Sequence, residues 1–237
     1  MSNSDRNTAA PNFSANGATA IDVGLRAFML RVYNYMAAGV GLTGVAAFLT
    51  YQFTGPELLQ SPLMWVFILA PLGLVFFISA RINRLSVEAA RGLFFLYAVL
   101  VGISLSTLFH IYTHSSITRV FFISAAAFGA LSLWGYTTRQ NLSGFGTFLF
   151  MGLIGIIIAS LVNLFLRSSG LDWVISVIGV GVFAGLTAYD TQRIKGTYDG
   201  GDDVASAGRK AVIGALSLYL DFINLFMMLL RLMGGRR

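Results

Sequence analysis

Two aspartates stand within long apolar stretches of this sequence, where an ionised side chain is costly. Asp190 lies in segment 186–195 (LTAYDTQRIK), and Asp221 lies in segment 215–226 (ALSLYLDFINLF). A charge near the centre of a bilayer costs at least about 2.5–3.5 kcal/mol, so acids at that depth usually have a function. If the two carboxyls meet, both cannot ionise cheaply, and the pair would share one proton around neutral pH. We therefore predict that Asp190 and Asp221 form a proton-sensitive site.

A polar stripe runs along the helix that is predicted around Asp221. Ser217, Asp221 and Asn224 are spaced i, i+4 and i+7, which puts them on one helix face, while Leu, Phe, Ile and Met occupy the other faces. The stripe must therefore face protein or water, and an interhelical hydrogen-bond clamp is the alternative to a functional site. Together with Asp190 and Thr187, the stripe offers the hard oxygen atoms that Ca²⁺ prefers.

Asp190 lies near one end of its predicted span. It precedes Lys195 by about one and a half helical turns, which places it ~8 Å below the membrane rim. Counted from Lys210, Asp221 is deeper, at ~16 Å, so a direct contact between the two acids requires a tilted or more deeply starting last helix. The alternative for Asp190 is an interfacial ion pair with Arg193 or with another loop cation.

Other polar groups give weaker signals of chemistry. His110 and His114 have the i, i+4 spacing of a metal-binding pair, but no third ligand accompanies them. Ser106 shares a helix with His110, where a base seldom reaches the serine in attack geometry. The chain contains no cysteine, which excludes disulfides and thiolate metal sites. We therefore expect no fixed metal and no cofactor.

The composition is that of a membrane protein. Hydrophobic residues make up 56% of the 237 residues and charged residues 11%, with a mean hydropathy of +0.75. A soluble domain has about 25% charged residues, so too few remain here to cover a soluble surface. The net charge of +6 is expected in cytoplasmic loops. Membrane lipid is therefore an expected partner, and nucleic acid is not.

Seven apolar stretches are long enough to cross a bilayer as helices. Residues 1–25 are polar and lack the apolar core of a secretory signal, so we expect a disordered cytoplasmic tail there. The loops between the stretches are short, which favours one seven-helix bundle over residues 26–237 without a second domain. The predicted spans are 30–51, 62–80, 92–113, 117–136, 145–166, 171–191 and 211–231.

The distribution of Lys and Arg favours a cytoplasmic N-terminus. This orientation puts eleven of the 16 basic residues on the cytoplasmic side. Arg231, Arg236 and Arg237 oppose it, because an odd number of spans leaves them outside. A last segment that dips in and returns would remove the conflict, but residues 211–231 are long enough to cross and contain no proline. We therefore predict seven complete spans.

The two aspartate segments, 186–195 and 215–226, resemble the hallmark segments of the Bax inhibitor-1 family, the transmembrane Bax-inhibitor-motif proteins. Segments 31–39 and 77–81 also fit, and the resemblance covers nearly the whole chain from about Arg26. YccA-like and YetJ-like proteins are bacterial members of this family. The resemblance implies an all-α integral membrane protein of the bacterial inner membrane, with six helices around a central last helix.

The resemblance also implies a function and roles for three residues. It implies a pH-sensitive calcium leak channel in which Asp190 and Asp221 are the pH sensor and calcium is the permeant ion. Arg81 resembles the second-span arginine that latches onto the sixth-span acid in the closed state. The second span of this chain contains no acid, so any family contribution of that kind is missing. Some bacterial relatives associate with a membrane-bound ATP-dependent protease, which makes a regulatory membrane protein acting through partners the alternative function.

An intramembrane aspartyl protease is a third possibility. Presenilin-type proteases carry Tyr-Asp in one span and a second Asp in the next, and Tyr189 with Asp190 matches the first element. Their second aspartate follows Gly-x-Gly, whereas Asp221 follows Leu-Tyr-Leu. Their Pro-Ala-Leu element is also absent, because the last proline of this chain is Pro71. We therefore expect that the protein is not an enzyme.

Overall fold

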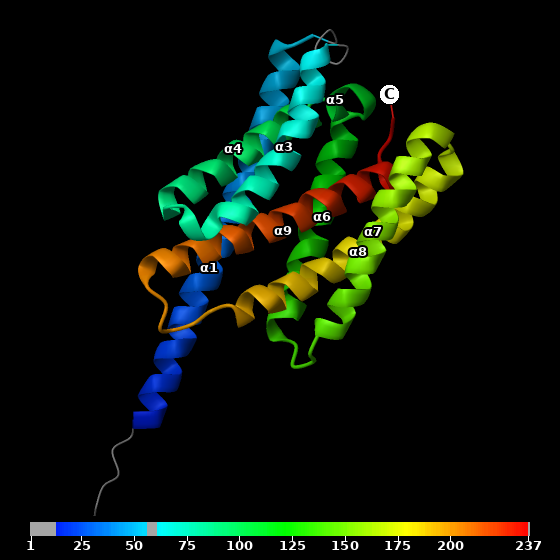
Figure 1. The fold of residues 1–237 in the computed structure, drawn as a ribbon. Helices are drawn as coiled ribbons and strands as arrows, with labels where there is room; N and C mark the ends of the chain where they lie inside the picture. The colour runs from blue at the N-terminus through cyan, green and yellow to red at the C-terminus, as the bar shows by residue number, and fades with distance from the viewer. Residues whose placement is uncertain (1–12, 56–60, 237) are drawn as a thin grey trace, which may run out of the picture.

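The computed structural model describes residues 13–55 and 61–236, with side chains described from Val23 onward in these ranges. Within them, seven helices are long and apolar enough to cross a membrane, as the sequence predicts. Figure 1 shows them packed as one elongated bundle. They are α1 (Phe13–Phe53), α3 (Pro62–Arg81), α4 (Val87–Leu105), α6 (His114–Thr137), α7 (Ser143–Leu166), α8 (Ser169–Gly196) and α9 (Val204–Met233), with the short η1 (Ile82–Arg84) and α5 (Leu108–Ile111) between them.

The N-terminal segment differs from its prediction. α1 begins at Phe13, so residues 13–25 of the predicted disordered tail are helical, while residues 1–12 lie outside the described ranges. Lengthening a formed helix costs far less than nucleating a new one, so a membrane span can extend through the polar residues that precede it. Hydropathy marks the membrane-embedded part of this helix and not its first residue.

The third predicted span is interrupted near its end. α4 and α5 are separated by Ser106 and Thr107, whose hydroxyls donate to the backbone carbonyls of Ile103 (2.7 Å) and Ser104 (3.2 Å). Hydroxyls that bond to the preceding turn compete with the regular helix hydrogen bonds and bend helices. Because the apolar residues continue through this region of the sequence, hydropathy did not predict the break between α4 and α5.

α8 and α9 extend beyond their predicted spans toward the connection 197–203. Asp203 caps the first turn of α9, and its carboxylate accepts a hydrogen bond from the Ser206 backbone N–H at 3.1 Å. Hydrogen bonds from Ser206, first from its hydroxyl and then from its backbone, hold the pKa of the Asp203 carboxyl below its usual range. The cap is therefore ionised at neutral pH, and α9 begins well before its apolar part.

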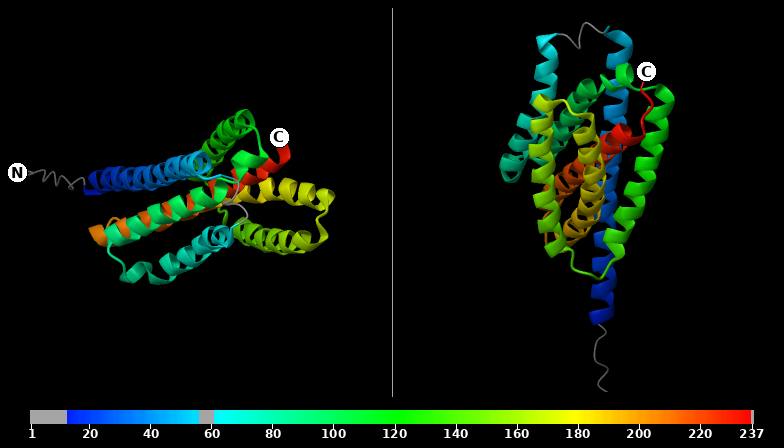
Figure 2. Two further views of the ribbon diagram at one scale, coloured as in Figure 1. Left: turned by 90° about the horizontal axis from the view of Figure 1, so that it is seen from above. Right: turned by 90° about the vertical axis from the view of Figure 1, so that its right-hand side faces the viewer.

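α9 is the central helix, as the resemblance implies. In its most apolar window 67% of the residues are buried, against 11% for α7. α9 packs against α1, α4, α6 and α8, and Figure 2 shows it running through the middle of the bundle. Its fully buried Tyr219 donates to the Thr43 hydroxyl of α1 (2.6 Å), which donates in turn to the Ala98 carbonyl of α4 (2.8 Å). These bonds connect three helices through the core.

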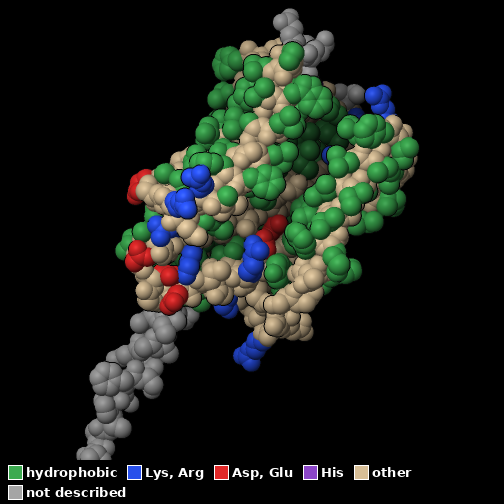
Figure 3. All heavy atoms as spheres, in the orientation of Figure 1, with side chains coloured by type: hydrophobic (Ala, Val, Ile, Leu, Met, Phe, Trp, Pro, Cys, Tyr) green, Lys and Arg blue, Asp and Glu red, His purple; other side chains and the backbone are tan. Residues whose placement is uncertain are grey.

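The two ends of the bundle differ in charge. One end, termed the basic end below, holds the start of α1 and the connections 82–86, 138–142 and 197–203. Figure 3 shows Lys and Arg side chains gathered over this end, where α9 begins. The chain ends at the opposite end, where the Thr113 N–H donates to the Gly235 carbonyl (3.0 Å) and the Gly235 N–H donates to the Ser116 hydroxyl (2.9 Å). α9 therefore runs the full length of the bundle and does not fold back, and Arg237 lies outside the described ranges.

A close backbone contact holds α8 beside α6. Gly135 of α6 is buried against the backbone of Ala188 in α8, and a Cβ at position 135 would overlap the Ala188 carbonyl oxygen. Gly129 lies on the same helix, and open space surrounds the point where its Cβ would be. Small residues let membrane helices approach closely, and at Gly135 the contact leaves no room for a side chain.

We predict that Gly135→Ala lowers the thermal unfolding midpoint of the purified protein in detergent, because a methyl group forced into a packed contact costs about 1–3 kcal/mol. Gly129→Ala is the matched control. It should leave the midpoint unchanged or raise it slightly, since alanine restricts the unfolded chain more than glycine does. Equal midpoints for the two variants would contradict the close α6–α8 contact.

Candidate functional site

A cavity of about 850 Å³, termed the central cavity, lies between α7, α8 and α9. Figure 3 shows a hollow on this face, with an acidic and a basic side chain together at one end of it. Most of the cavity wall is apolar. Besides the ring of Tyr189, its polar side chains are Thr147, Ser160, Asp190, Arg193, Ser217, Asp221 and Asn224. The fold therefore brings both predicted aspartates to one space.

The polar stripe predicted on the last helix faces this cavity. Ser217, Asp221 and Asn224 all line it, whereas Leu218 between them is fully buried in the core. The side-chain amide of Asn224 donates to the Leu220 carbonyl one turn earlier (2.8 Å), which leaves its oxygen as an acceptor. α9 thus has one face packed in the core and one face that lines the cavity, and the spacing of its polar residues determines which residues belong to each face.

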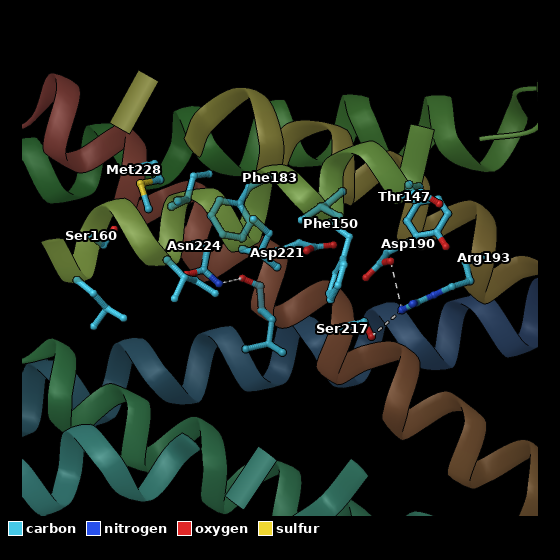
Figure 4. A pocket seen from close by; sticks show the side chains of 18 of the residues that line it. Thr147, Phe150, Ser160, Phe183, Asp190, Arg193, Ser217, Asp221, Asn224 and Met228 are labelled. Carbon is cyan, nitrogen blue, oxygen red and sulfur yellow. Dashed lines mark hydrogen bonds and ion pairs between the residues drawn. The ribbon is translucent and has the colours of Figure 1, made fainter. Parts of the chain in front are cut away.

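Asp221 is the most deeply placed acid of the site. The residue is 5% exposed, and its Oδ2 atom has no hydrogen-bond partner among the described residues. Figure 4 shows Asp221 in the same part of the cavity as Asp190, with Phe150 beside them. Leaving a buried polar group unpaired costs about 1–3 kcal/mol, and more when it is charged. This oxygen therefore needs a proton, a cation or water from the cavity.

Asp190 forms an ion pair with Arg193, one turn further along α8. Arg193 Nη2 lies 3.2 Å from Asp190 Oδ1 and donates to Ser217 Oγ on α9 at 3.3 Å (Figure 4). The guanidinium also lies over the Tyr189 ring, 5.6 Å from its centroid. The Arg193 side chain is 48% exposed, against 12% for that of Asp190. Arg193 therefore connects a buried acid to the accessible end of the cavity and bridges α8 to α9.

The sequence allowed two roles for Asp190, an interfacial ion pair or a site shared with Asp221. The structure contains both arrangements, since Asp190 pairs with Arg193 and also lines the cavity with Asp221. The Oδ2 atom of Asp221 has no hydrogen-bond partner among the described residues, Asp190 included. α8 and α9 both run obliquely in Figure 1, and Asp221 and Asp190 line one cavity between them.

Two residues predicted to serve the site lie elsewhere. Arg81 is exposed at the end of α3, which packs against α4, so the implied latch on Asp190 is not formed in this structure. Arg193 holds Asp190 instead, because a cation one helical turn away reaches the acid without moving a helix. Thr187 is fully buried and donates to the Phe183 carbonyl (2.8 Å). It is rotated by ~60° from Asp190 around the helix and does not line the cavity.

Sequence reasoning missed the residues that fix α8 beside the cavity. Thr191 hydrogen-bonds to Ser132 of α6 at 2.8 Å. Gln192 accepts from the backbone N–H of Leu142, just before α7, at 2.9 Å, and Lys195 donates to a backbone carbonyl of α6 at 2.9 Å. The sequence signal for these contacts was the stretch from Asp190 to Lys195, which is polar except for Ile194. Successive residues point ~100° apart around a helix, so such a run must contact several partners.

Two smaller cavities continue the central cavity in both directions. Toward the basic end, a cavity of about 450 Å³ shares Arg193 and Ser217 with it. Toward the C-terminal end, a cavity of about 330 Å³ shares residues including Ser160 with it, and contains the ion pair of Arg231 with Asp172 (3.6 Å). The three cavities follow one another along the bundle, with an arginine ion pair near each end.

The seven spans of the described residues, one of them a buried central helix, and the two acids in one cavity between them define a polytopic α-helical membrane protein with an acidic site inside its membrane-spanning part. The family model described as inhibitor of apoptosis-promoting Bax1 matches residues 25–237. The chain belongs to the Bax inhibitor-1 family, as the two aspartate segments indicated.

Related sequences cover almost the whole chain. The inner membrane protein YbhL of Escherichia coli strain K12 is 48% identical over 219 residues, which are 90% of this chain and 94% of that protein. An uncharacterized protein of Rickettsia prowazekii is 48% identical over 220 residues, 91% of this chain and 92% of the relative. An uncharacterized protein of Caulobacter vibrioides is 44% identical over 230 residues, 92% of each chain. The chain is therefore a multi-pass membrane protein with a relative in the bacterial inner membrane.

We predict that Arg193→Gln raises the affinity of the central cavity for a metal cation. The half-exposed ion pair with Asp190 is worth up to ~1 kcal/mol, which corresponds to about fivefold in a dissociation constant. Tb³⁺ titrated into the purified protein in detergent measures this affinity, because a nearby tyrosine, here Tyr189, sensitises the luminescence of bound Tb³⁺.

Arg81→Gln is the matched control for this measurement, because it removes the same charge at the same end of the bundle but outside the cavity lining. It should leave the Tb³⁺ affinity at the wild-type value. The double variant Asp190→Asn, Asp221→Asn should lose the cavity signal. An equal gain of affinity in Arg81→Gln and Arg193→Gln would argue against a specific role of Arg193.

Proposed function

We propose that this protein is a pH-sensitive cation leak channel of the bacterial inner membrane, with calcium as the permeant ion. The observation that carries the proposal is the buried Oδ2 atom of Asp221, which has no hydrogen-bond partner among the described residues, in a cavity shared with Asp190. A purely structural clamp would pair this oxygen with a neighbouring helix, since buried polar atoms are normally satisfied. A site that exchanges protons and cations would leave a carboxyl that lines the cavity, as that of Asp221 does, without a fixed protein partner.

The oxygen donors of the cavity suit a hard cation that binds briefly. Asp190, Asp221, Ser217 and Asn224 line it, and Ca²⁺ takes 6–8 oxygen ligands of these types. In the described ranges, no group of three or more His, Cys, Asp or Glu side chains is placed to hold a metal. Two carboxylates with few further ligands attract a divalent cation and still release it, as conduction requires. Calcium is a permeant ion in this proposal and not a resident cofactor.

Protonation of the two acids would set the charge of the cavity. Two carboxyls in one cavity titrate as a unit, because ionising one beside the other is unfavourable. Arg193 competes with an entering cation for Asp190. A change of pH would therefore alter both the attraction of the cavity for cations and the ion pair at the basic end.

The basic end faces the cytoplasm in this proposal. Lys and Arg favour the cytoplasmic side of a membrane, and they gather at this end of the bundle in Figure 3. The N-terminus is then cytoplasmic, and the leak runs along the three cavities. Its inner ion pair is that of Arg193, and its outer ion pair is that of Arg231.

Asp221→Asn keeps the shape and hydrogen bonding of the side chain but removes its charge. We expect this variant to flatten the pH dependence of calcium flux into proteoliposomes, whereas wild-type flux should pass through a transition near neutral pH. Asp190→Asn should have the same effect, and the double variant should add little, because coupled acids titrate together. Circular dichroism and the unfolding midpoint of each variant are the controls for folding.

Other outcomes of the same experiment separate the alternatives. A structural role of Asp221 predicts wild-type flux for Asp221→Asn, and a lower unfolding midpoint only for Asp221→Leu. An intramembrane protease predicts no ion flux, with substrate cleavage lost in either asparagine variant. Wild-type protein that passes no cation at any pH would refute the channel. A regulatory role through partners, such as a membrane-bound ATP-dependent protease, would then remain.

A further inference from the structure

The cavity at the basic end, termed the basic cavity, has more positive than negative side chains in its lining, which does not favour the passage of cations. It has a volume of about 450 Å³ and is bounded by η1, the end of α8 and the first turns of α9. Its lining includes three cations, Arg193, Arg209 and Lys210, and one acid, Asp202. A concave wall with an excess of positive charge repels cations and concentrates anions.

The ion pairs at the basic cavity do not include Arg209. Lys210 pairs with Asp202 at 2.6 Å. Arg209 forms no ion pair with a described residue, and its Nη2 donates to the neutral hydroxyl of Ser206 at 3.1 Å. Asp203, which caps α9, is close enough to Arg209 for the two charges to interact, but it does not belong to the lining. A guanidinium keeps its charge at every physiological pH, so the positive potential of this cavity persists.

Neutral hydrogen-bonding groups lie beside these cations. The basic cavity is also lined by Asn83 of η1, Thr197 just after α8, and Ser206 of α9. The Thr197 hydroxyl already donates to the Ile194 carbonyl (2.7 Å). The side-chain amide of Asn83 and the guanidinium of Arg209 are the donors offered to a phosphate oxygen, and the guanidinium fork matches phosphate geometry. We propose that the basic cavity binds a phosphate-bearing anion, either the headgroup of an anionic phospholipid in the adjacent leaflet or free phosphate.

Arg193 couples this anion site to the central cavity. It lines both cavities, and its guanidinium is shared between Asp190 and Ser217 at their junction. An anion in the basic cavity competes with Asp190 for the same guanidinium, so its binding loosens the ion pair. By linkage, the ion pair weakens anion binding in turn, so removal of the Asp190 charge should strengthen it. The effect on ion leak rests on the proposed function, whereas anion binding does not.

Anion binding is tested on the purified full-length protein in a neutral detergent. The probes are inorganic phosphate and dihexanoyl phosphatidylglycerol, with dihexanoyl phosphatidylcholine for comparison, each titrated by calorimetry at fixed ionic strength. We expect an anionic probe to bind, and Arg209→Gln to weaken it about tenfold, the usual effect of losing a charged hydrogen bond. Arg209→Lys should weaken it less, because it keeps the charge but not the fork.

Arg139→Gln is the matched control, because Arg139 is an exposed arginine at the same end that lies outside the lining. It should bind the anionic probe like the wild type. Asp190→Asn should bind it several-fold more tightly. Binding of phosphate indicates that free phosphate is sufficient, and binding of phosphatidylglycerol alone indicates a lipid headgroup site. No binding of either probe, or equal losses in Arg209→Gln and Arg139→Gln, would overturn the proposal.

Calcium flux tests the coupling separately from binding. We expect phosphatidylglycerol in phosphatidylcholine proteoliposomes, or added phosphate, to raise flux several-fold in the wild type and in Arg139→Gln, but not in Arg209→Gln. Flux that is present but unchanged by both anions would show that the coupling is wrong. Absence of wild-type flux under every condition would refute the leak channel, and the calorimetric result would still decide whether the anion site exists.

Discussion

The fold depends on the requirement that polar groups of a helix surrounded by protein and lipid find partners inside the bundle, because water is not available to them. α9 meets this requirement on one face and departs from it on the other. Tyr219 is fully buried and bonded through Thr43 to the neighbouring helices. Asp221, two positions later, has a buried oxygen without a protein partner and lines the central cavity. The most buried helix of the structure therefore presents an unsatisfied acid to an internal space.

α8 supplies the complement to this acid. Its stretch from Asp190 to Lys195, polar except for Ile194, is held on several sides by hydrogen bonds to α6 and to the residue that precedes α7. These bonds fix the rotation of the helix and hence the direction of Asp190. Arg193 is left at the junction of two cavities, where it contacts Asp190 and Ser217. The anchoring of one helix thus places both a carboxylate and its counter-charge at the same opening.

The three cavities alternate in the sign of their charged groups. The central cavity has two acids and one arginine, whereas the basic cavity has three cations and one acid. The cavity near the C-terminus contains Arg231 paired with Asp172, and also Arg167. A cation that moves along this sequence meets positive groups at both ends and negative groups between them. In the proposed channel, the passage of ions would therefore depend on the arginines as much as on the aspartates, and an anion near Arg209 would lower the barrier at one end.

The sequence by itself determined the features that depend on short distances along the chain. Hydrophobic length specified seven spans, and the spacing of Ser217, Asp221 and Asn224 specified one polar face, because both follow from helix geometry alone. The tertiary structure decided which groups meet. It paired Asp190 with Arg193 in place of Arg81 and turned Thr187 away from the cavity. Such contacts depend on the tilt and rotation of each helix, which result from the packing of the whole bundle and not from any one segment.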